Sequence, residues 1–296
     1  MLAWCSDIQE TRAPSEHHPI TSLLHHILFI LAMLLAPPAL AEQKPLWEVG
    51  LGVGAVTFPD YRGSDEVNVY PVPVPYVVYR GKFLRADREG VRGELFDRRY
   101  AEFTISADAS VPVRSKDNDA RRGMDDLEPT VELGPSLELH VWRSQDERFK
   151  VDAVMPVRLP FTVESSPQSI GWVVEPRINL DIVEPAGMKG WNLGLGVGPV
   201  IADSKFNQFV YSVDPRFATP QRPAYDAEGG YSGARFVSAI SKRFPKYWVG
   251  AYLRYDTLRG AVFEDSPLVR RTNYISGGIG IAWMIGQSST LVESDD

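Results

Sequence analysis

The sequence predicts an all-β protein, an antiparallel transmembrane β-barrel of about twelve strands (ten to twelve), and three observations support this fold class. The first is a series of segments that are apolar at every second position and small or charged in between. The second is an alternation of short and long connections. The third is an N-terminal export signal, which together with the other two observations favours a barrel in the outer membrane of a Gram-negative cell over a soluble periplasmic β-protein.

Residues 274–285, YISGGIGIAWMI, show the alternation most clearly. One face carries Ile275, Ile279, Ile281, Trp283 and Ile285, whereas the other carries Ser276, Gly278, Gly280 and Ala282. A soluble strand that packs one apolar face inward shows polar side chains to water on its second face. This strand shows only small residues there, which is typical of a barrel strand whose apolar face meets lipid.

The first 41 residues predict a cleaved signal peptide. An apolar run at 20–36 is followed by a small-x-small sequence, Ala39-Leu40-Ala41, so we expect cleavage between Ala41 and Glu42. The alternative is an N-terminal membrane anchor, for which the run is short. The single cysteine, Cys5, lies in this leader, so the mature chain is expected to have no disulfide and no thiolate metal site.

Apolar side chains at alternate positions mark the strands of the remaining chain, and Gly, Pro and Asp mark the turns between them. No segment shows convincing helical periodicity. We expect strands at 46–58, 68–79, 82–88, 91–96, 100–111, 128–142, 148–160, 170–183, 190–201, 231–243, 246–259 and 273–285. The barrel therefore spans 42–286 and is followed by a polar, acidic tail at 287–296. No apolar run after residue 41 is long enough for a transmembrane helix.

Short and long connections alternate along this series. The long ones are 59–67, 112–127, 161–169, 202–230 and 260–272, and the short ones include 80–81, 97–99, 143–147 and 184–189. Outer-membrane barrels have short periplasmic turns and long outer loops. The short turn at 89–90 is the exception. The charges of the loop at 112–127, among them Asp119, Arg121 and Arg122, are interpreted as solvated.

A set of titratable side chains falls in the phase opposite the apolar positions: Glu102, Asp108, Glu132, Glu138, His140, Lys150, Asp152, Arg158, Glu175, Arg177, Asp181, Arg254 and Asp256. An Arg or Lys on the lipid face near the bilayer midplane costs about 2–4 kcal/mol. We therefore expect all of them to face the lumen, where their interleaved signs predict a filling of ion pairs.

Catalytic and metal sites are not expected. His140 is the only histidine after the leader, and no nucleophile and orienting group can be assigned to it. Two of the acids Glu132, Glu138, Glu175 and Asp181 could form the carboxylate pair of a glycosidase. Arginines lie in the same phase, however, so we expect ion pairs instead. Asp60, Asp65 and Glu66 could bind a divalent cation, but these residues do not have EF-hand spacing. The chain is predicted to use no cofactor, and its net charge of −7 argues against a nucleic-acid partner.

Two segments carry a resemblance to a known family. Tyr61-Arg-Gly-Ser-Asp65 is followed by Val69-Tyr-Pro-Val-Pro-Val-Pro-Tyr76, and Asp265-Ser-Pro-Leu-Val269 comes late in the chain. With the opening 47–54 and the glycine-rich last strand, the chain resembles the MltA-interacting protein (MipA)/OmpV family over 46–285. The motif positions are Gly63, Ser64, Asp65, Tyr70, Pro71, Pro73, Pro75, Ser266 and Pro267. The resemblance implies an outer-membrane barrel that in some members links a lytic transglycosylase to a peptidoglycan synthase.

The prolines at 71, 73 and 75 have a physical consequence. Alternate residues of a strand direct their backbone groups to the same neighbour, so all three missing donors lie on one seam. A proline within a sheet removes a ladder hydrogen bond. One interpretation is a local opening, a lateral docking edge or a kink toward the lumen. The other is a bulged strand end near the outer rim.

Three function classes remain. A non-catalytic scaffold would bind a murein hydrolase or synthase at the periplasmic rim, where the charged short turns and the tail 287–296 meet. A small-solute channel or a surface adhesin-type barrel is the alternative, since a polar lumen is compatible with conduction. A barrel enzyme needs a clustered nucleophile that the sequence does not offer. The resemblance favours the scaffold, with lipid as the other partner.

Overall fold

The computed structural model describes residues 43–80, 84–87, 90–93 and 100–293. The predicted signal peptide and its cleavage site at Ala41 and Glu42 lie outside these residues, as do the turn at 97–99 and residues 294–296 of the predicted tail. Within the described part of the chain, no helix has the length and apolarity needed to cross a bilayer.

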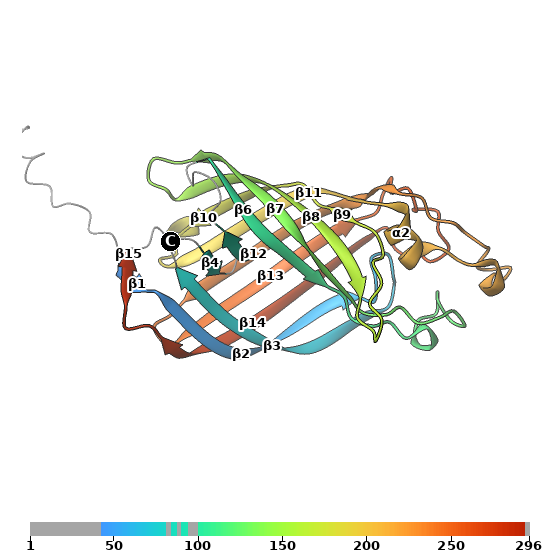
Figure 1. The fold of residues 1–296 in the computed structure, drawn as a ribbon, viewed down its shortest axis with the longest axis horizontal. Coiled ribbons are helices and arrows are strands. Elements are labelled where there is room, and N and C mark those ends of the chain that lie inside the picture. Colours follow the sequence, from blue (N-terminus) through green and yellow to red (C-terminus); the bar gives the residue numbers. More distant parts are fainter. Residues whose placement is uncertain (1–42, 81–83, 88–89, 94–99, 294–296) are drawn as a thin grey trace, which may run out of the picture. The chain divides into compact units, whose positions relative to one another are not determined.

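Strands dominate the structure (Figure 1). They are β1 (Gln43–Pro45), β2 (Trp47–Pro59), β3 (Val67–Arg80), β4 (Leu84–Asp87), β5 (Gly90–Gly93), β6 (Ala101–Ala109), β7 (Thr130–Arg143), β8 (Phe149–Thr162), β9 (Val173–Val174), β10 (Arg177–Val183), β11 (Trp191–Ala202), β12 (Gly230–Arg243), β13 (Tyr247–Thr257), β14 (Asn273–Gln287) and β15 (Leu291–Glu293). Within the described ranges, one α-helix, α2 (Ser204–Tyr211), and three 3-10 turns at 115–117, 185–187 and 215–217 lie between the strands.

Thirteen of these strands form one sheet that closes on itself. β14 pairs with β2, and β8 pairs with both β7 and β10, so the antiparallel ladder returns to its start. β9 and β10 together occupy the predicted strand at 170–183, which Pro176 interrupts because proline cannot donate to the ladder. Counting them as one leaves twelve positions. The ring confirms the predicted antiparallel β-barrel.

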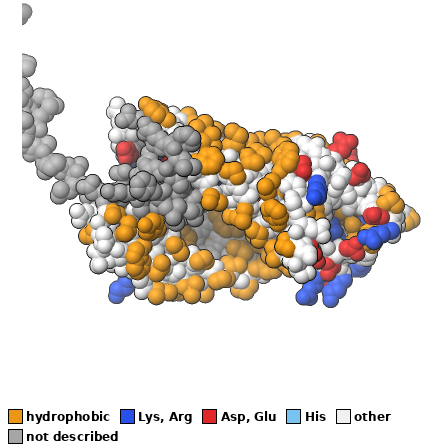
Figure 2. All heavy atoms as spheres, viewed as in Figure 1, with side chains coloured by type: hydrophobic (Ala, Val, Ile, Leu, Met, Phe, Trp, Pro, Cys, Tyr) orange, Lys and Arg blue, Asp and Glu red, His pale blue; other side chains and the backbone are white. Residues whose placement is uncertain are grey.

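Apolar side chains cover the outside of the barrel wall, while charged side chains gather at the end where the long loops lie (Figure 2). On β14, Ile275 is 65% exposed, Ile279 68% and Ile285 71%, whereas Ser276 and Ala282 between them are buried. The same alternation runs along β2 and β8. An apolar exterior of this kind requires lipid rather than water around the wall.

The small residues of β14 and β2 permit a close approach inside the barrel. A Cβ added at Gly54 or Gly280 would lie 3.0 Å from a methyl group of Val74 on β3. At Gly52 an added Cβ would lie 1.7 Å from the carbonyl oxygen of Ile281. The sheet therefore curls so sharply at β14–β2–β3 that only glycine fits at these three inner positions, which explains why glycine recurs opposite the apolar positions.

A bulge corrects the expected direction of one tryptophan. Strict alternation would turn Trp142 inward, yet it is 53% exposed, as is its neighbour Val141 at 60%. The register of β7 against β8 shifts between His140 and Trp142. The extra residue of the bulge places two consecutive side chains outside. Trp142 therefore belongs to the outer surface near the short turns, where tryptophan favours the membrane interface.

The loop at 202–230 contains the helix that periodicity did not reveal. Asp203 caps α2, because its carboxylate accepts a hydrogen bond from the Phe206 amide at 3.0 Å. The same carboxylate accepts from the amide of Trp172 at 3.2 Å. Eight residues are too few for a convincing 3.6-residue repeat, so the helix depends on its cap and on packing against neighbouring loops.

β3 is bonded along one edge and almost free along the other. It pairs with β2 from Val67 to Tyr79 but with β4 only at Tyr79 and Arg80. The Arg80 amide donates to the Leu46 carbonyl at 2.8 Å, and the Asp60 amide donates to the Glu66 carbonyl at 3.0 Å. The backbone groups of the even-numbered residues of β3 therefore point toward β2. Pro71, Pro73 and Pro75 are odd-numbered, so their backbone groups point away from β2, toward the edge without a ladder partner among the described residues.

The chain that follows β14 returns to the first strand. The Ser288 amide donates to the Trp47 carbonyl at 2.8 Å and the Leu46 amide donates to the Thr290 carbonyl at 2.9 Å. β15 pairs with β1 in a separate two-stranded sheet. Residues 288–290 are thus bonded to the start of the barrel, so removing them would expose backbone groups of β2.

Candidate functional site in the lumen and at the two barrel ends

Four long connections pack together at one end of the barrel and form what we call the cap (residues 60–66, 110–129, 203–229 and 258–272). Its buried apolar core comprises Tyr61, Val113, Ala120, Leu127, Tyr211, Val213, Ala227, Leu258, Ala261, Phe263 and Leu268. The rings of Tyr211 and Phe263 stack at 3.7 Å. A core drawn from four loops indicates a folded layer over the barrel mouth rather than independent mobile loops.

The motif residues around position 63 join the cap. Gly63 has a φ of +97°, which an L side chain rarely adopts, and its carbonyl accepts from the amides of Arg270 and Arg271 at 2.7 and 3.0 Å. The buried Ser64 hydroxyl accepts from Asn118 at 3.0 Å. Ser266, also buried, donates to the Tyr211 carbonyl at 2.7 Å. Three motif positions therefore hold loops to one another.

The other motif residues have different surroundings. Asp65 is exposed, and Pro267 is half-buried beside Ser266. Tyr70 stacks on Phe58 with ring centroids 5.0 Å apart. Asp60 accepts hydrogen bonds from Asn68 at 2.7 Å and Asn118 at 2.9 Å, so its oxygens already serve the cap.

The cap corrects the interpretation of the loop at 112–127 as simply solvated. Arg121 is 4% exposed and donates to the Val210 carbonyl at 3.0 Å. Arg222, from another loop, donates to the carbonyls of Ala120 and Arg122, both at 3.0 Å. The sequence signal was the same as for a surface arginine, because burial here depends on a loop distant in the chain. Asp119 and Arg122 do remain exposed, as a surface ion pair.

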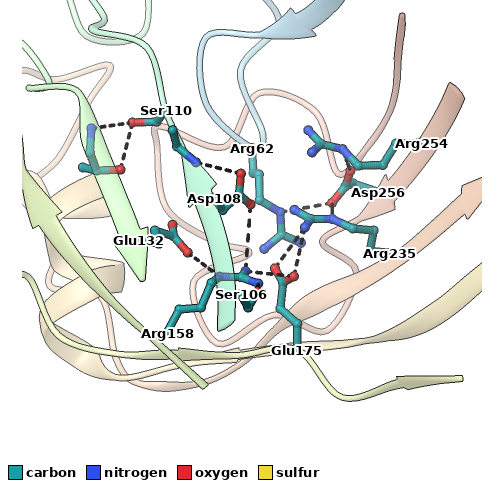
Figure 3. Close-up of polar contacts among 12 residues, drawn as sticks. Arg62, Ser106, Asp108, Ser110, Glu132, Arg158, Glu175, Arg235, Arg254 and Asp256 are labelled. Carbon is teal, nitrogen blue, oxygen red and sulfur yellow. Dashed lines mark hydrogen bonds and ion pairs between the residues drawn. The ribbon is translucent and has the colours of Figure 1, made fainter. Parts of the chain in front are cut away.

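Beneath the cap, four arginines and four carboxylates form a continuous network of ion pairs (Figure 3). Glu175 lies between Arg158 at 2.9 Å and Arg235 at 3.0 Å. Arg235 in turn pairs at 3.2 Å with Asp256, which is fully buried. The network therefore links β8, the β9–β10 junction, β12 and β13 across the lumen.

Arg62 and Arg158 complete the network at its ends. Arg62, from the loop between β2 and β3, pairs with Asp256 at 3.2 Å, and its own carbonyl accepts from the Tyr211 hydroxyl. Arg158 pairs with Glu132 at 3.0 Å and with Asp108 at 3.9 Å. Asp108 and Glu132 are directly opposite on β6 and β7, a like-charge arrangement that Arg158 compensates. Arg254 pairs with Asp256 at 3.0 Å.

A second polar group lies nearer the short turns. Glu102 and Glu138 are opposite each other on β6 and β7, and His140 faces Asp152 across β7 and β8 at 2.9 Å. Arg143 approaches the same Asp152 oxygen at 2.6 Å and His140 Nδ1 at 2.7 Å. Glu138, His140 and Asp152 have the spacing of a metal site, but the Arg143 guanidinium already contacts two of these three residues, His140 and Asp152. These contacts are those of an ion-pair group.

The remaining charges of the predicted lumen set lie on β8 and β10. Lys150 and Asp181 are direct cross-strand neighbours, a favourable arrangement of opposite charges. Arg177 is half-buried opposite Val154 on the same pair of strands. Thus the structure brings together Asp108, Glu132, Arg158, Glu175, Arg254 and Asp256 in one network, and Glu102, Glu138, His140 and Asp152 in another.

Residues outside the predicted set also take part in these interactions, among them Arg62, Glu48 and Arg243. Glu48 is 4% exposed and pairs with Arg80 at 3.1 Å and Arg243 at 2.6 Å, which closes a small polar belt at the short-turn end. Its position in the glycine phase of 48–54 was an available signal. Arg62 lies in a loop, where no periodicity marks the inward direction.

With this geometry established, comparisons with known proteins identify the family. Residues 51–285 match the family described as MltA-interacting protein MipA. The chain belongs to this family. The predicted resemblance is therefore confirmed, and the MipA match covers the barrel from β2 to β14 together with the cap. No curated protein sequence matches the chain.

Solved outer-membrane proteins are among the structures to which the chain is similar. An outer membrane channel from Pseudomonas putida F1 is 11% identical, with a TM-score of 0.45 over 84% of this chain and 100% of that one. Outer membrane phospholipase A from Escherichia coli is 11% identical, with a TM-score of 0.32 over 81% and 94%. A FadL homologue from Pseudomonas aeruginosa is 11% identical, with a TM-score of 0.31 over 84% and 74%.

Two buried tyrosines make the cap sensitive to alkali. Burial raises the pKa of Tyr61 and of Tyr211 above the usual value of about 10. The folded cap therefore binds these protons more tightly than unfolded loops do. The stabilisation is complete below about pH 10 and decreases as the pH rises beyond it. We expect the cap to become protease-sensitive above about pH 10, and replacing both tyrosines by phenylalanine to shift that transition upward.

Proposed function

We propose that this chain is a non-catalytic outer-membrane scaffold that binds peptidoglycan-processing enzymes, a lytic transglycosylase or a murein synthase, at its short-turn end. The family description supports this proposal, because it names an interaction with MltA, a murein enzyme. In outer-membrane barrels the short turns face the periplasm, where such enzymes act. Among the described residues, the His140 imidazole contacts the charged side chains of Glu102, Arg143 and Asp152, which also favours a binding protein over an enzyme.

The observation that carries the proposal is a pair of strained neighbouring turns at this end. Glu147, Glu184 and Ala186 have φ values of 54°, 52° and 51°, and they are the described non-glycine residues with positive φ. Such conformations cost about 1–3 kcal/mol each and concentrate at functional sites. All three lie in the turns at 144–148 and 184–190, which precede β8 and follow β10, two strands that pair with each other.

Arg148 holds the two turns together. Its guanidinium donates to the Glu184 carbonyl at 2.8 Å, and its carbonyl accepts from the Val183 amide at 2.8 Å. The surface that results, which we call the rim patch, displays Gln145, Asp146, Glu147, Met188 and Lys189. Met188 is 43% exposed, an apolar side chain among charges. The mixture fits a weak protein contact, below the ~1,200 Å² of stable interfaces.

The alternative of a small-solute channel is less well supported. The cap has a buried core over the long-loop mouth, and the ion pairs below it cross the lumen. Among the described residues, both features obstruct an aqueous path from the lumen to the outer surface. Conductance in planar bilayers distinguishes the two functions: the scaffold is expected to be closed in its folded state, whereas steady small-solute conductance by the wild type would favour the channel.

The test of the scaffold is a double charge reversal, Glu147→Lys with Lys189→Glu. Both side chains are exposed, so the variant barrel should fold. We expect it, like the wild type, to migrate differently on gels before and after heating, because a closed barrel resists detergent until it is heated. We expect co-purification of the murein enzyme from crosslinked envelopes to fall by about tenfold, which corresponds to roughly 1.4 kcal/mol of binding free energy. Arg143 and Arg148 are unsuitable for reversal, because their heads bond to Asp152 and to backbone carbonyls.

A matched control changes the same charges at the opposite end. Glu128 and Lys205 are exposed in the cap, and Glu128→Lys with Lys205→Glu should leave co-purification unchanged. If this cap variant loses the enzyme while the rim variant retains it, binding occurs at the long loops instead and the rim proposal is wrong.

A further inference from the structure

The free edge of β3 faces a part of the wall where the ladder is incomplete. β3 runs from Val67 to Arg80 but pairs with β4 only at its last two residues, Tyr79 and Arg80. On the other side, β6 pairs with β5 only at Phe103, Thr104 and Ile105, although it extends to Ala109. Beyond the short β4–β5 pair, therefore, no described residue completes the ladder between β3 and β6. The ribbons of β3 and β6 stand apart in Figure 1, and Figure 2 shows a hollow in this part of the wall.

The sequence of β3 prevents this gap from closing by strand pairing. Backbone groups of its odd-numbered residues point to the gap, and three of these residues are Pro71, Pro73 and Pro75. From Val69 to Val77 the edge therefore presents a row of carbonyls and almost no amide donors. A pairing strand needs donors and acceptors in alternation. Neither β6 nor a strand from another chain can pair with this stretch of β3.

An unpaired edge inside a bilayer requires water. Each unsatisfied backbone group in hydrocarbon costs several kcal/mol, and irregular backbone at membrane depth occurs where it is buried in protein or lines a water-filled cavity. The carbonyls at Pro71, Pro73 and Pro75 point away from β2, so water reaching them has to come through the wall from the lumen. This part of the wall is then a wet slot that borders hydrocarbon.

The two borders of the slot have different chemistry. β3 is apolar on both faces: Val69, Pro71, Pro73, Pro75 and Val77 lie outside, and Tyr70, Val72, Val74, Tyr76 and Val78 lie on the lumen side. The inner face of β6 instead carries Thr104, Ser106 and Asp108, and Ser106 bonds to Arg158 at 3.3 Å. One border suits a hydrocarbon chain and the other suits a hydrated polar group.

From this geometry we propose that the gap between β3 and β6 is a lateral portal for single-chain amphiphiles. The polar head moves through the wet slot along β6 toward the ion-paired lumen, while the chain lies against β3 in continuity with the bilayer. The cap closes the long-loop mouth, so the wall offers such a molecule a route that the mouth does not. This role is independent of enzyme binding at the rim patch.

Cysteine labelling in liposomes tests the portal. Pro73 and Val53 are register partners on β3 and β2, so they lie at the same depth, and both are exposed outside the barrel. In a Cys5→Ser background, we expect Pro73→Cys to react with a charged, water-soluble methanethiosulfonate at least about tenfold faster than Val53→Cys, because only the free edge is hydrated. Pro71 and Pro75 remain in place to keep the edge open.

Competition with an amphiphile completes the test. Palmitoyl-lysophosphatidylcholine should slow labelling of Pro73→Cys several-fold, and the double-chain dipalmitoyl lipid should not. Gln145→Cys on the exposed rim reports any general effect of the amphiphile on the reagent. Equal reaction rates at positions 73 and 53 would show that the edge is dry and would overturn the portal. Fast labelling at position 73 that the lysolipid leaves unchanged would overturn the passage of amphiphiles. Enzyme capture at the rim is unaffected by either result.

Discussion

Replacing Asp256 by asparagine should destabilise the cap and the upper lumen by about 3–5 kcal/mol, the typical effect of removing one partner from a buried ion pair. Asp256 is fully buried and is the shared partner of Arg62, Arg235 and Arg254. Without the charge of Asp256, three guanidinium groups lie close together, and Glu175 is the carboxylate left in the network to balance their positive charge. The like charges repel, and the loop that carries Arg62 loses its attachment to the barrel.

The effect should appear in the loops before it appears in the barrel. We expect new protease cleavage in 203–229 and 258–272 and a lower unfolding temperature, while the strands keep their heat-dependent gel shift. Asp125→Asn is the matched control, because that carboxylate pairs with Arg216 on the surface, where an ion pair contributes about 0.2–1 kcal/mol. Equal protease resistance in Asp256→Asn and wild type would mean that the network does not hold the cap.

Gly52→Ala should prevent the barrel from closing between β2 and β14. The added Cβ would lie 1.7 Å from the Ile281 carbonyl oxygen and 2.4 Å from the Ala282 Cα, and both are backbone atoms that cannot rotate away. Overpacking of this severity is expected to exceed about 3 kcal/mol, the upper end of the usual range. The folded, fast-migrating form on unheated gels should be strongly reduced.

Gly194→Ala provides the comparison on another strand. Its Cβ would meet Asp181 Oδ1 at 3.2 Å, which is the far end of a side chain that can move. This variant should fold with near wild-type yield in the same refolding assay. If Gly52→Ala folds equally well, the sheet between β2 and β14 is less tightly curved than described here, and the explanation given for the glycine-rich face of β14 is wrong.

The predicted strands and the observed ones agree because barrel strands carry their information locally. Alternation has a period of two residues, so Ile275 to Ile285 define which face of β14 is outside without reference to any other strand. Pro176 and the bulge at Trp142 are departures that depend on neighbours. The helix α2 was missed because eight residues and one capping aspartate give little periodic signal.

The largest differences between the predicted and the observed structure lie in the loops. The resemblance marked Gly63, Ser64 and Ser266 as motif positions, but it did not say that they join loops far apart in the chain. In the sequence Arg121 has the pattern of a solvated charge, but in the structure it is buried and donates a hydrogen bond to the Val210 carbonyl. Such contacts depend on which loops the barrel places side by side, and a single sequence does not contain that arrangement.

By itself the sequence determined the fold class, the phase of the strands, the length of the connections and the family. It also placed three missing donors on one seam, because the backbone direction in a strand alternates as its side chains do. Only the tertiary structure decided which neighbour that seam faces, which charges pair across the lumen, and that the long loops share a core. These features depend on the stagger and curvature of the closed sheet, which bring together residues such as Glu48 and Arg243, 195 positions apart.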